Sequence, residues 1–328
     1  MWGMYDRLPV AGVVLVRGLI LASMCFSCVA PLAAKPVVPG TGIKLSEVAD
    51  DFEADDWKYS PNLPKSSRNI DDYERRPFGL SANRLWVEGP HRGTPDLLRR
   101  VPTPDGGLEG STGALLMRTM RSGVPGQHSW EEQQDDLMAN ATEHLGGYLS
   151  VQRTPSVVAR VFVPEFEEWE RRNGTSFAFR LDLKGNRGEG SEAYWPGIFF
   201  QFQGKSGSRR PEDSAHLVIR ARRSGHDFRG PNITQSGWWT VGMSVTPDGQ
   251  VHFYAHPGVD PLTEADHLAS EYCYGFQAIR FQTFFFNVLS RDDGRTWSTP
   301  WIIDDPELFV VEMPRQMAKQ PGSKSRSR

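Results

Sequence analysis

The stretch Phe281–Val311 reads FQTFFFNVLSRDDGRTWSTPWIIDDPELFVV and decides the fold class. Phe284 and Phe286 alternate with other side chains at a spacing of two residues, and Trp301 and Ile303 repeat that spacing further on. An alternation of this kind is typical of β-strands that bury one face. The stretch therefore predicts two strands with a tight turn between them.

The turn itself contains Arg291-Asp292-Asp293-Gly294. Aspartate side chains accept hydrogen bonds from backbone amides in turns, and glycine adopts the positive φ that a hairpin loop needs. Residues 290–297 fit S-x-D-x-G-x-T-W, so this predicted hairpin resembles the Asp-box of sialidases and related propellers. A propeller would repeat the motif in several blades, and the chain holds one copy. A braced hairpin in another β fold, with Asp292 as the brace, is the favoured interpretation.

Composition places the chain among the all-β proteins. Its 328 residues include 32 Gly and 24 Pro, and 11% are aromatic, which favours many strands and turns over helix bundles. The net charge of −3 argues against a nucleic-acid partner held by a general basic field.

The two ends of the chain differ in composition from its middle. Residues 1–34 combine Arg7 and Arg17 with an apolar run and predict an export signal, too short for a stable membrane span. Residues 35–48 are Pro/Gly-rich and predict a linker, residues 49–313 the folded domain, and residues 314–328 a disordered basic tail. An extracellular or periplasmic location follows from the signal. Cys273 is then the one cysteine of the mature chain, and we expect it to be a buried small side chain.

Strand patterns recur along the domain, separated by Gly and Pro. A surface helix is expected between the strands at 114–120 and 157–163, at 128–142, and a short one at 165–171. A hairpin is expected at Thr246-Pro247-Asp248-Gly249. The predicted strands are 85–87, 114–120, 157–163, 176–183, 198–203, 216–223, 238–245 and 251–254, followed by those of the opening stretch. Short strands with little helix predict an all-β sandwich or barrel.

An acidic segment opens the domain. Asp51, Glu53 and Asp55 lie beside Phe52 and Trp57, which fits an edge strand kept from aggregating by its charges. A structural calcium site is the alternative, because calcium binds clustered carboxylates. No other cofactor is expected.

Several short motifs together resemble the concanavalin A-like lectin/glucanase superfamily, which includes laminin-G-like modules. They are the opening at 52–57, W-P-G-I-F-F at 195–200, the pattern at 239–254 that contains P-D-G, and W-I-I-D-D-P at 301–306. The resemblance covers about residues 50–312. It implies a jelly-roll sandwich of two antiparallel sheets with a polysaccharide or other glycan on the concave sheet.

The sequence contains only part of the catalytic motif of the glycoside hydrolases in this superfamily. The run at 195–198 resembles the W-P-A-x-W of glycoside hydrolases in this superfamily, where an acid pair follows on the next strand. Here the next segment holds Gln201, Gln203, His216 and Arg220 instead of two acids. Because glycosidic cleavage requires two carboxyl groups at a fixed separation, we do not expect a retaining glycosidase of that type.

On each of three predicted strands, polar side chains occupy every second position and so point to the same face of that strand. We expect the three polar faces to form one surface. Such groups suit a glycan-binding groove with tryptophan platforms, or a polysaccharide lyase or hydrolase on the same face, with Tyr254, His216 and Arg220 as the catalytic set of a lyase. Solvent-facing polar residues of a structural cell-surface module are the third interpretation. The expected ligand-binding residues are Gln201, Gln203, His216, Arg220, Arg222, Trp195, Trp238, Trp239, His252 and Tyr254. We favour a secreted carbohydrate-binding jelly-roll protein.

Overall fold

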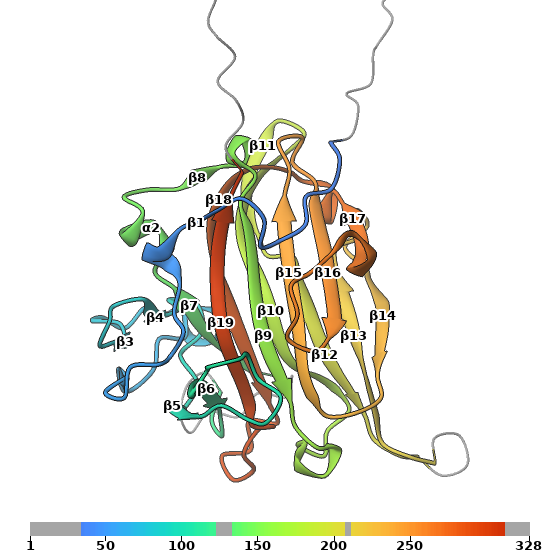
Figure 1. Cartoon of the computed structure of the whole chain (residues 1–328). Helices are drawn as coiled ribbons and strands as arrows, with labels where there is room; N and C mark the ends of the chain where they lie inside the picture. Colours follow the sequence, from blue (N-terminus) through green and yellow to red (C-terminus); the bar gives the residue numbers. More distant parts are fainter. Residues whose placement is uncertain (1–33, 123–132, 207–210, 312–328) are drawn as a thin grey trace, which may run out of the picture. The chain divides into compact units, whose positions relative to one another are not determined.

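The computed structural model describes residues 34–122, 133–206 and 211–311. These residues form two antiparallel sheets that pack face to face (Figure 1), so the prediction of an all-β, jelly-roll-like sandwich is confirmed. The predicted export signal, apart from Ala34, and the predicted basic tail lie outside the described residues.

One sheet has eight strands and the other eleven within the described residues. The 8-stranded sheet has the order β17 (His267–Glu271), β16 (Val251–Pro257), β15 (Gly237–Val245), β9 (Ser156–Val163), β19 (Trp301–Val310), β6 (Gly113–Arg118) and β5 (Leu97–Pro102), with β1 (Ile43–Lys44) beside β19. The 11-stranded sheet has the order β14 (Asp227–Ile233), β13 (Ser214–Arg220), β12 (Gly197–Gln203), β10 (Gly174–Arg187), β18 (Gln277–Ser290), β7 (Gln133–Ala139), β4 (Trp86–Glu88), β3 (Leu80–Ser81) and β2 (Tyr59–Ser60), with β11 (Gly190–Tyr194) beside β10 and β8 (Leu149–Ser150) beside β18.

Helices are short and lie between strands. The α-helices are α1 (Arg68–Asp71) and α2 (Ala141–His144), and the 3-10 turns are η1 (Ser46–Val48), η2 (Val151–Arg153), η3 (Phe166–Glu168), η5 (Glu264–Asp266) and η6 (Cys273–Gly275). In the described part of the chain, no helix is both long and apolar enough to cross a membrane.

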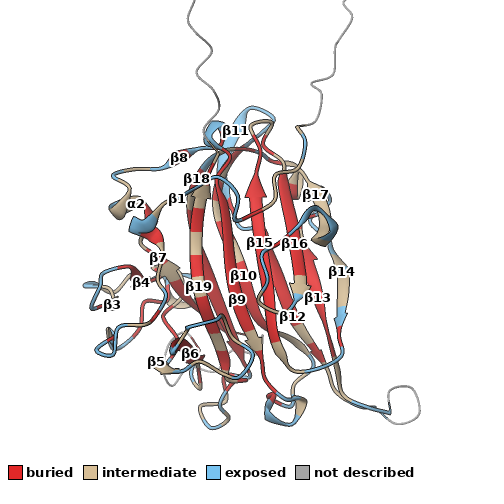
Figure 2. Cartoon of the chain, viewed as in Figure 1, coloured by how far each residue is buried: buried red, intermediate tan, exposed pale blue. Residues whose placement is uncertain are grey.

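Aromatic side chains fill the space between the sheets. Trp301 of β19 stacks on Phe177 of β10 with ring centroids 4.8 Å apart, and Phe177 in turn stacks on Phe286 of β18 at 5.9 Å. All three side chains are fully buried, and Figure 2 shows buried residues along the central strands of both sheets. Contacts of this type add about 0.5–1.5 kcal/mol each beyond the burial of apolar area. The alternation in residues 281–311 thus marks the strand faces that point into the core.

The predicted hairpin around residues 290–297 is wrong. β18 pairs with β10 and β7, whereas β19 pairs with β9 and β6, so residues 291–300 carry the chain from one sheet to the other. The turn is nevertheless braced by Asp293, whose carboxylate accepts from the backbone amides of Arg295 at 2.8 Å and Thr296 at 2.7 Å. Gly294 has the expected positive φ of 64°. Local turn chemistry does not specify which strands will pair, and this explains the error.

Two further predictions differ from the structure. Of the segment expected as a helix at 128–142, residues 133–139 form strand β7, and the helix α2 begins at Ala141. The expected linker at 35–48 packs against the 8-stranded sheet, where β1 pairs with β19 and Val37 O accepts from the Ser244 hydroxyl at 2.5 Å. By contrast, the turn at 246–249 joins β15 to β16 as an antiparallel hairpin, as predicted.

We expect Asp293→Ala to lower the free energy of unfolding by about 0.5–2 kcal/mol, by analogy with the loss of a helix N-cap, because two backbone amides lose their acceptor. Urea denaturation of wild type and variant measures the change. The exposed neighbour Arg295→Ala is the matched control and should alter stability by less than about 0.5 kcal/mol. Equal stability of the two variants would show that the Asp293 brace contributes nothing.

Candidate functional site

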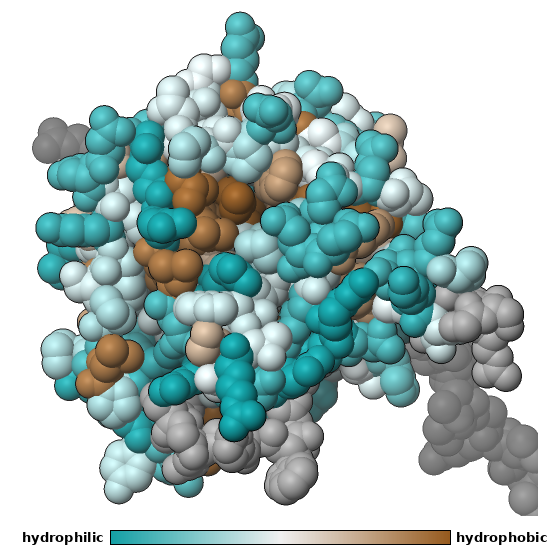
Figure 3. Space-filling view, turned by 90° about the horizontal axis from the view of Figure 1, so that it is seen from below, coloured by the Kyte–Doolittle hydropathy of each residue, from teal (hydrophilic) through white to brown (hydrophobic). Residues whose placement is uncertain are grey.

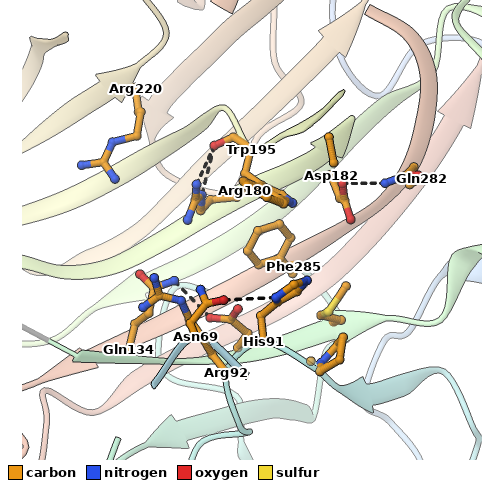
Figure 4. A pocket seen from close by; sticks show the side chains of 15 residues that line it. Asn69, His91, Arg92, Gln134, Arg180, Asp182, Trp195, Arg220, Gln282 and Phe285 are labelled. Atoms are coloured by element: carbon orange, nitrogen blue, oxygen red, sulfur yellow. Dashed lines mark hydrogen bonds between the residues drawn. The ribbon is translucent and has the colours of Figure 1, made fainter. Parts of the chain in front are cut away.

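A pocket of about 550 Å³ opens on the face of the 11-stranded sheet that points away from the core (Figure 4). Its floor comes from β7, β10, β13 and β18, and its walls come from the segments before β12 and after β4. It is lined by Asn69, Gly89, Pro90, His91, Arg92, Gln134, Asp136, Met138, Arg180, Asp182, Ala193, Trp195, Arg220, Gln282 and Phe285. Because inward residues of these strands fill the core, their outward neighbours supply the pocket.

The middle of the floor is one row of residues that face each other across neighbouring strands. Arg180 of β10 lies opposite Phe285 of β18 on one side and opposite Gly197 of β12 on the other. Gly197 in turn lies opposite Arg220 of β13. The Arg180 guanidinium carbon lies 5.3 Å from the centre of the Phe285 ring and 5.4 Å from that of Phe199. The guanidinium carbon of Arg220 lies 4.3 Å from the same Phe199 ring. Phe285, Arg180, Phe199 and Arg220 thus alternate rings with cations, and we call them the arginine row.

Gly197 makes room for this arrangement. A Cβ at this position would lie 2.6 Å from Cγ of Arg180 and 2.7 Å from the carbonyl oxygen of Phe179. The Arg180 side chain therefore crosses β12 where no side chain stands, and its Nε and Nη2 donate to Trp195 O at 3.2 and 2.7 Å. This geometry explains why β12 begins with a glycine, at a strand position where a side chain would otherwise be favoured.

The wall opposite β12 consists of the segment after β4. The carbonyl of Gly93 accepts from the Asp136 amide at 2.7 Å, and the carbonyl of His91 accepts from the Asn69 amide at 3.1 Å. His91 Nδ1 also lies 3.1 Å from the Asn69 side-chain oxygen. The His91 and Trp195 rings approach edge to face across the pocket, with centroids 6.5 Å apart. Two walls that lie far apart in sequence thus meet above the floor (Figure 4).

Two carboxyl groups lie in the pocket, each held by side-chain amides. Asp136 accepts from Asn287 Nδ2 at 2.6 Å and from Gln134 Nε2 at 3.3 Å, and Asp182 accepts from Gln282 Nε2 at 2.7 Å. Burial raises the pKa of Asp136 to about 6 and that of Asp182 to about 6. Burial also lowers the pKa of Arg180 to about 10 and lowers the pKa of His91. Loss of water is the first cause in each case, since it disfavours the charged form.

Of the expected ligand-binding residues, Trp195 and Arg220 line this pocket. Gln201, Gln203 and His216 lie on the same outward face of β12 and β13, beyond the lining residues, with Gln201 and His216 as cross-strand partners. Arg222 follows β13 and lies over the Phe228 ring at 5.6 Å.

The remaining expected residues belong to the other sheet. Trp239 is buried in the core, and Trp238 packs on Phe162 of the 8-stranded sheet with centroids 5.4 Å apart. His252 and Tyr254 lie on the outer face of β16, also in that sheet, and both are buried. The expected single surface, and with it a catalytic set of Tyr254, His216 and Arg220, is therefore wrong. Alternation along a strand shows which residues share a face of that strand, but it does not show which sheet the strand belongs to.

His252 instead takes part in a chain of hydrogen bonds. Its Nε2 lies 2.7 Å from the Thr246 hydroxyl, which donates to Asp248 at 2.6 Å, and its Nδ1 lies 2.7 Å from the Ser270 hydroxyl. Burial lowers the pKa of His252 to about 4, so the imidazole is neutral near pH 7. These contacts satisfy a buried polar side chain and join β16 to its neighbours.

The three acids considered for calcium have separate partners. Asp51 accepts from the Glu53 amide at 3.1 Å, Glu53 accepts from the Thr112 amide at 2.8 Å, and Asp55 lies 3.5 Å from Arg100. Within the described ranges, no group of three or more His, Cys, Asp or Glu side chains is arranged to hold a metal ion. Cys273 is buried, and burial raises its pKa well above the usual value, as for an inert thiol.

Sequence reasoning missed most of the pocket. Arg180 and Asp182 did alternate with Phe179 and Leu181 in a predicted strand, so their outward direction could have been inferred. Asp136 lies in a segment for which the sequence predicts a helix, so the pattern does not reveal its outward position on strand β7. His91, Arg92 and Asn69 come from a turn-rich segment without periodicity, and only the three-dimensional contacts reveal them.

Comparison with known proteins gives structural likenesses only. No family model matches the chain, and no curated protein matches its sequence. A carbohydrate esterase from a Shiga toxin-encoding bacteriophage is 12% identical, covers 70% of this chain and 91% of its own, and has a TM-score of 0.42.

Two lyases are similar at the same level. Alginate lyase A1-II′, of polysaccharide lyase family 7, is 11% identical, covers 64% of this chain and 86% of its own, and has a TM-score of 0.36. An endo-β-1,4-glucuronan lyase from the fungus Trichoderma reesei is 12% identical, covers 77% and 95%, and has a TM-score of 0.36. Likeness at this level assigns no activity to this chain, and one fold hosts many functions.

We expect Gly197→Ala to destabilise the protein by about 1–3 kcal/mol, because the added methyl group must displace the Arg180 stem or the backbone of β10. Thermal or urea unfolding measures this. Gly190→Ala in the neighbouring strand is the control, since the atom nearest to its new Cβ is 3.7 Å away. A Gly197→Ala protein as stable as the control would contradict the close fit of Arg180.

We expect Asp182→Asn to stabilise the protein at pH 8 by up to about 3 kcal/mol and to have little effect at pH 4. The raised pKa of Asp182 means that the folded state favours the protonated carboxyl, so its stability is full below pH 4 and falls as the pH rises through about 6. An asparagine keeps an acceptor for Gln282 and carries no charge. Urea denaturation at both pH values gives the difference, with the exposed Asp260→Asn as the control. An equal effect at both pH values would refute burial as the cause.

Proposed function

We propose that the chain binds a polysaccharide in the pocket on the outward face of the 11-stranded sheet. The observation that carries the proposal is the combination of rings and amides around one cavity: Trp195, Phe285 and His91 supply the rings, and Asn69, Gln134 and Gln282 the amides. Ligand sites are concave, largely apolar and furnished with a few convergent polar groups, and this cavity of about 550 Å³ has all three properties.

The chemistry of sugars fits these groups. A sugar ring has C–H faces, which pack on aromatic rings, and hydroxyl groups at its edge, which both donate and accept hydrogen bonds. Amide side chains offer a donor and an acceptor on one group. Trp195 is 38% exposed although it lies beside a buried strand, so its ring is accessible to a ligand. Aromatic side chains with one accessible face are common anchors in binding sites.

A polysaccharide lyase on the same face is the second candidate, and one backbone feature favours it. Tyr274 has φ of 56°, which is uncommon for a bulky residue, and strained residues cluster at functional sites. Its pKa is raised to about 12 by burial, while the charges of Arg180 and Arg220 act to lower it. Its phenol therefore lies within electrostatic range of both cations. Tyr274 replaces Tyr254 as the candidate proton carrier.

Export of the protein belongs to the same proposal. The apolar run that suggests it lies in residues 1–33, outside the described residues, so the evidence for secretion is the sequence pattern alone.

We expect Trp195→Ala to weaken glycan binding at least tenfold, as for the loss of a central aromatic anchor. The measurement is binding of purified protein to an array of neutral, uronate-containing and sulfated polysaccharides, followed by titration with the polymers retained. Trp297→Ala is the matched control, because Trp297 is 36% exposed and does not line the pocket. Equal losses in both variants, or no retention of any polysaccharide by wild type, would overturn the proposal.

The lyase candidate is tested on the same polymers by absorbance of the unsaturated product. Turnover by wild type that disappears in Tyr274→Phe supports it, whereas retention without turnover supports binding alone.

A further inference from the structure

Arg180 carries a charge that the described residues do not neutralise by direct contact. Its side-chain hydrogen bonds go to one carbonyl oxygen, that of Trp195, and no carboxylate among the described residues lies within ion-pair distance of it. Rings of Phe199 and Phe285 lie beside its guanidinium on the floor of the pocket. Buried charges are normally paired, so an arginine held in this way at the bottom of a cavity needs an explanation.

A second cation has the same property. Arg92 lines the pocket from the opposite wall and forms no hydrogen bond or ion pair with the residues that the structure describes. Its charge acts on both Asp136 and Arg180, which places it in electrostatic range of the floor.

The third cation, Arg220, is paired. Its Nε and Nη2 donate to Asp227 at 3.0 and 2.9 Å, and Asp227 does not line the pocket. Because Arg180 and Arg220 lie over the same Phe199 ring, their charges are one aromatic ring apart along the floor. Asp227 fixes the Arg220 guanidinium at the end of the arginine row.

The carboxyl groups of the pocket do not cancel these charges at low pH. The ionisable groups that line it are His91, Arg92, Asp136, Arg180, Asp182 and Arg220, with Tyr274 close by. Burial lowers the pKa of His91, so it is neutral near pH 7. With both acids ionised the lining carries three positive and two negative charges, and protonation of the acids leaves three positive charges.

We propose that the ligand is a polyanionic glycan that carries carboxylate or sulfate groups on more than one sugar unit, with one anionic group on Arg180 between the charges of Arg92 and Arg220. The inference rests on the proposed function, because it names the class of polysaccharide that the pocket takes. Arginine suits this task, since its planar guanidinium binds carboxylate or sulfate oxygens with two parallel donors while its faces stack on rings.

The affinity should then depend on salt and pH in a defined way. Added salt screens charges and weakens the binding of an anion. Lowering the pH from 8 to 5 protonates Asp136 and Asp182, whose pKa values are about 6, and removes two negative charges from the pocket. Sugar carboxylates and sulfates stay largely ionised at pH 5, so affinity for the polyanion should rise on acidification while affinity for a neutral glycan stays constant.

The test uses the polysaccharide array described above, with competition between oligogalacturonate and its methyl ester, which differ only in charge. We expect wild type to retain acidic polymers and to prefer the free acid at least tenfold where galacturonate is retained. Arg180→Gln and Arg92→Gln should each weaken retention of acidic polymers at least fivefold. Arg99→Gln, which removes an exposed charge from the other sheet, should not.

Arg92→Gln keeps the test valid if Arg180→Gln fails to fold, because Arg92 has no partner in the described residues. Retention of neutral polymers only, or of acidic polymers with unchanged affinity in both variants, would overturn the inference and leave the proposed function intact. Retention of no polymer at all would overturn both.

Discussion

Aromatic packing between the two sheets determines where everything else on the 11-stranded sheet points. Phe286 of β18 stacks on Phe177 and on Phe179 of β10, and Phe177 also stacks on Trp301 of β19, so these strands have a fixed inward face. The surface seen from below in Figure 3 is mostly hydrophilic, with one hydrophobic patch. Once the inward set is fixed, a shift by one residue would bury Arg180 and expose Phe179. The position of the arginine on the pocket floor is therefore a consequence of core packing.

The sequence predicted the features that follow from the alternation of apolar and polar residues along a strand. It did not predict the features that depend on contacts between segments far apart in the chain. Alternation along 176–183, 198–203 and 281–290 identified the strands, their inward faces and hence the sandwich. It could not tell that β16 belongs to the other sheet, because parity is the same in either sheet. It also gave no sign that residues 291–300 cross between sheets, because the hydrogen bonds of Asp293 are local to the turn and do not specify which sheet the next strand joins.

The pocket wall depends on a buried ion pair on the inner side of β7. Asp135 points inward and binds the Lys65 ammonium at 2.6 Å, whereas its neighbour Asp136 points into the pocket. Lys65 also packs where a Cβ of Gly93 would be, and it reaches Asp96 at 2.8 Å, so one ammonium ties together three segments that frame Arg92. Breaking a buried pair of this kind leaves an uncompensated charge and is strongly destabilising. Polar contacts of Lys65 thus hold the pocket wall in position, and such contacts leave no periodic pattern in the sequence.

Arg180 shows how the same packing couples stability to recognition. Burial lowers its pKa to about 10, so holding this cation among rings, with no carboxylate in direct ion-pair contact within the described residues, lowers the stability of the folded state. Asp136 and Asp182, with pKa values near 6, are also disfavoured in their charged forms. A bound anion would relieve the first cost, and any ligand that binds only the folded state raises the free energy of unfolding. The charge that destabilises the folded protein is therefore the charge that an anionic ligand would use, and both effects arise from the outward position that Phe177 and Phe179 impose on Arg180 of β10.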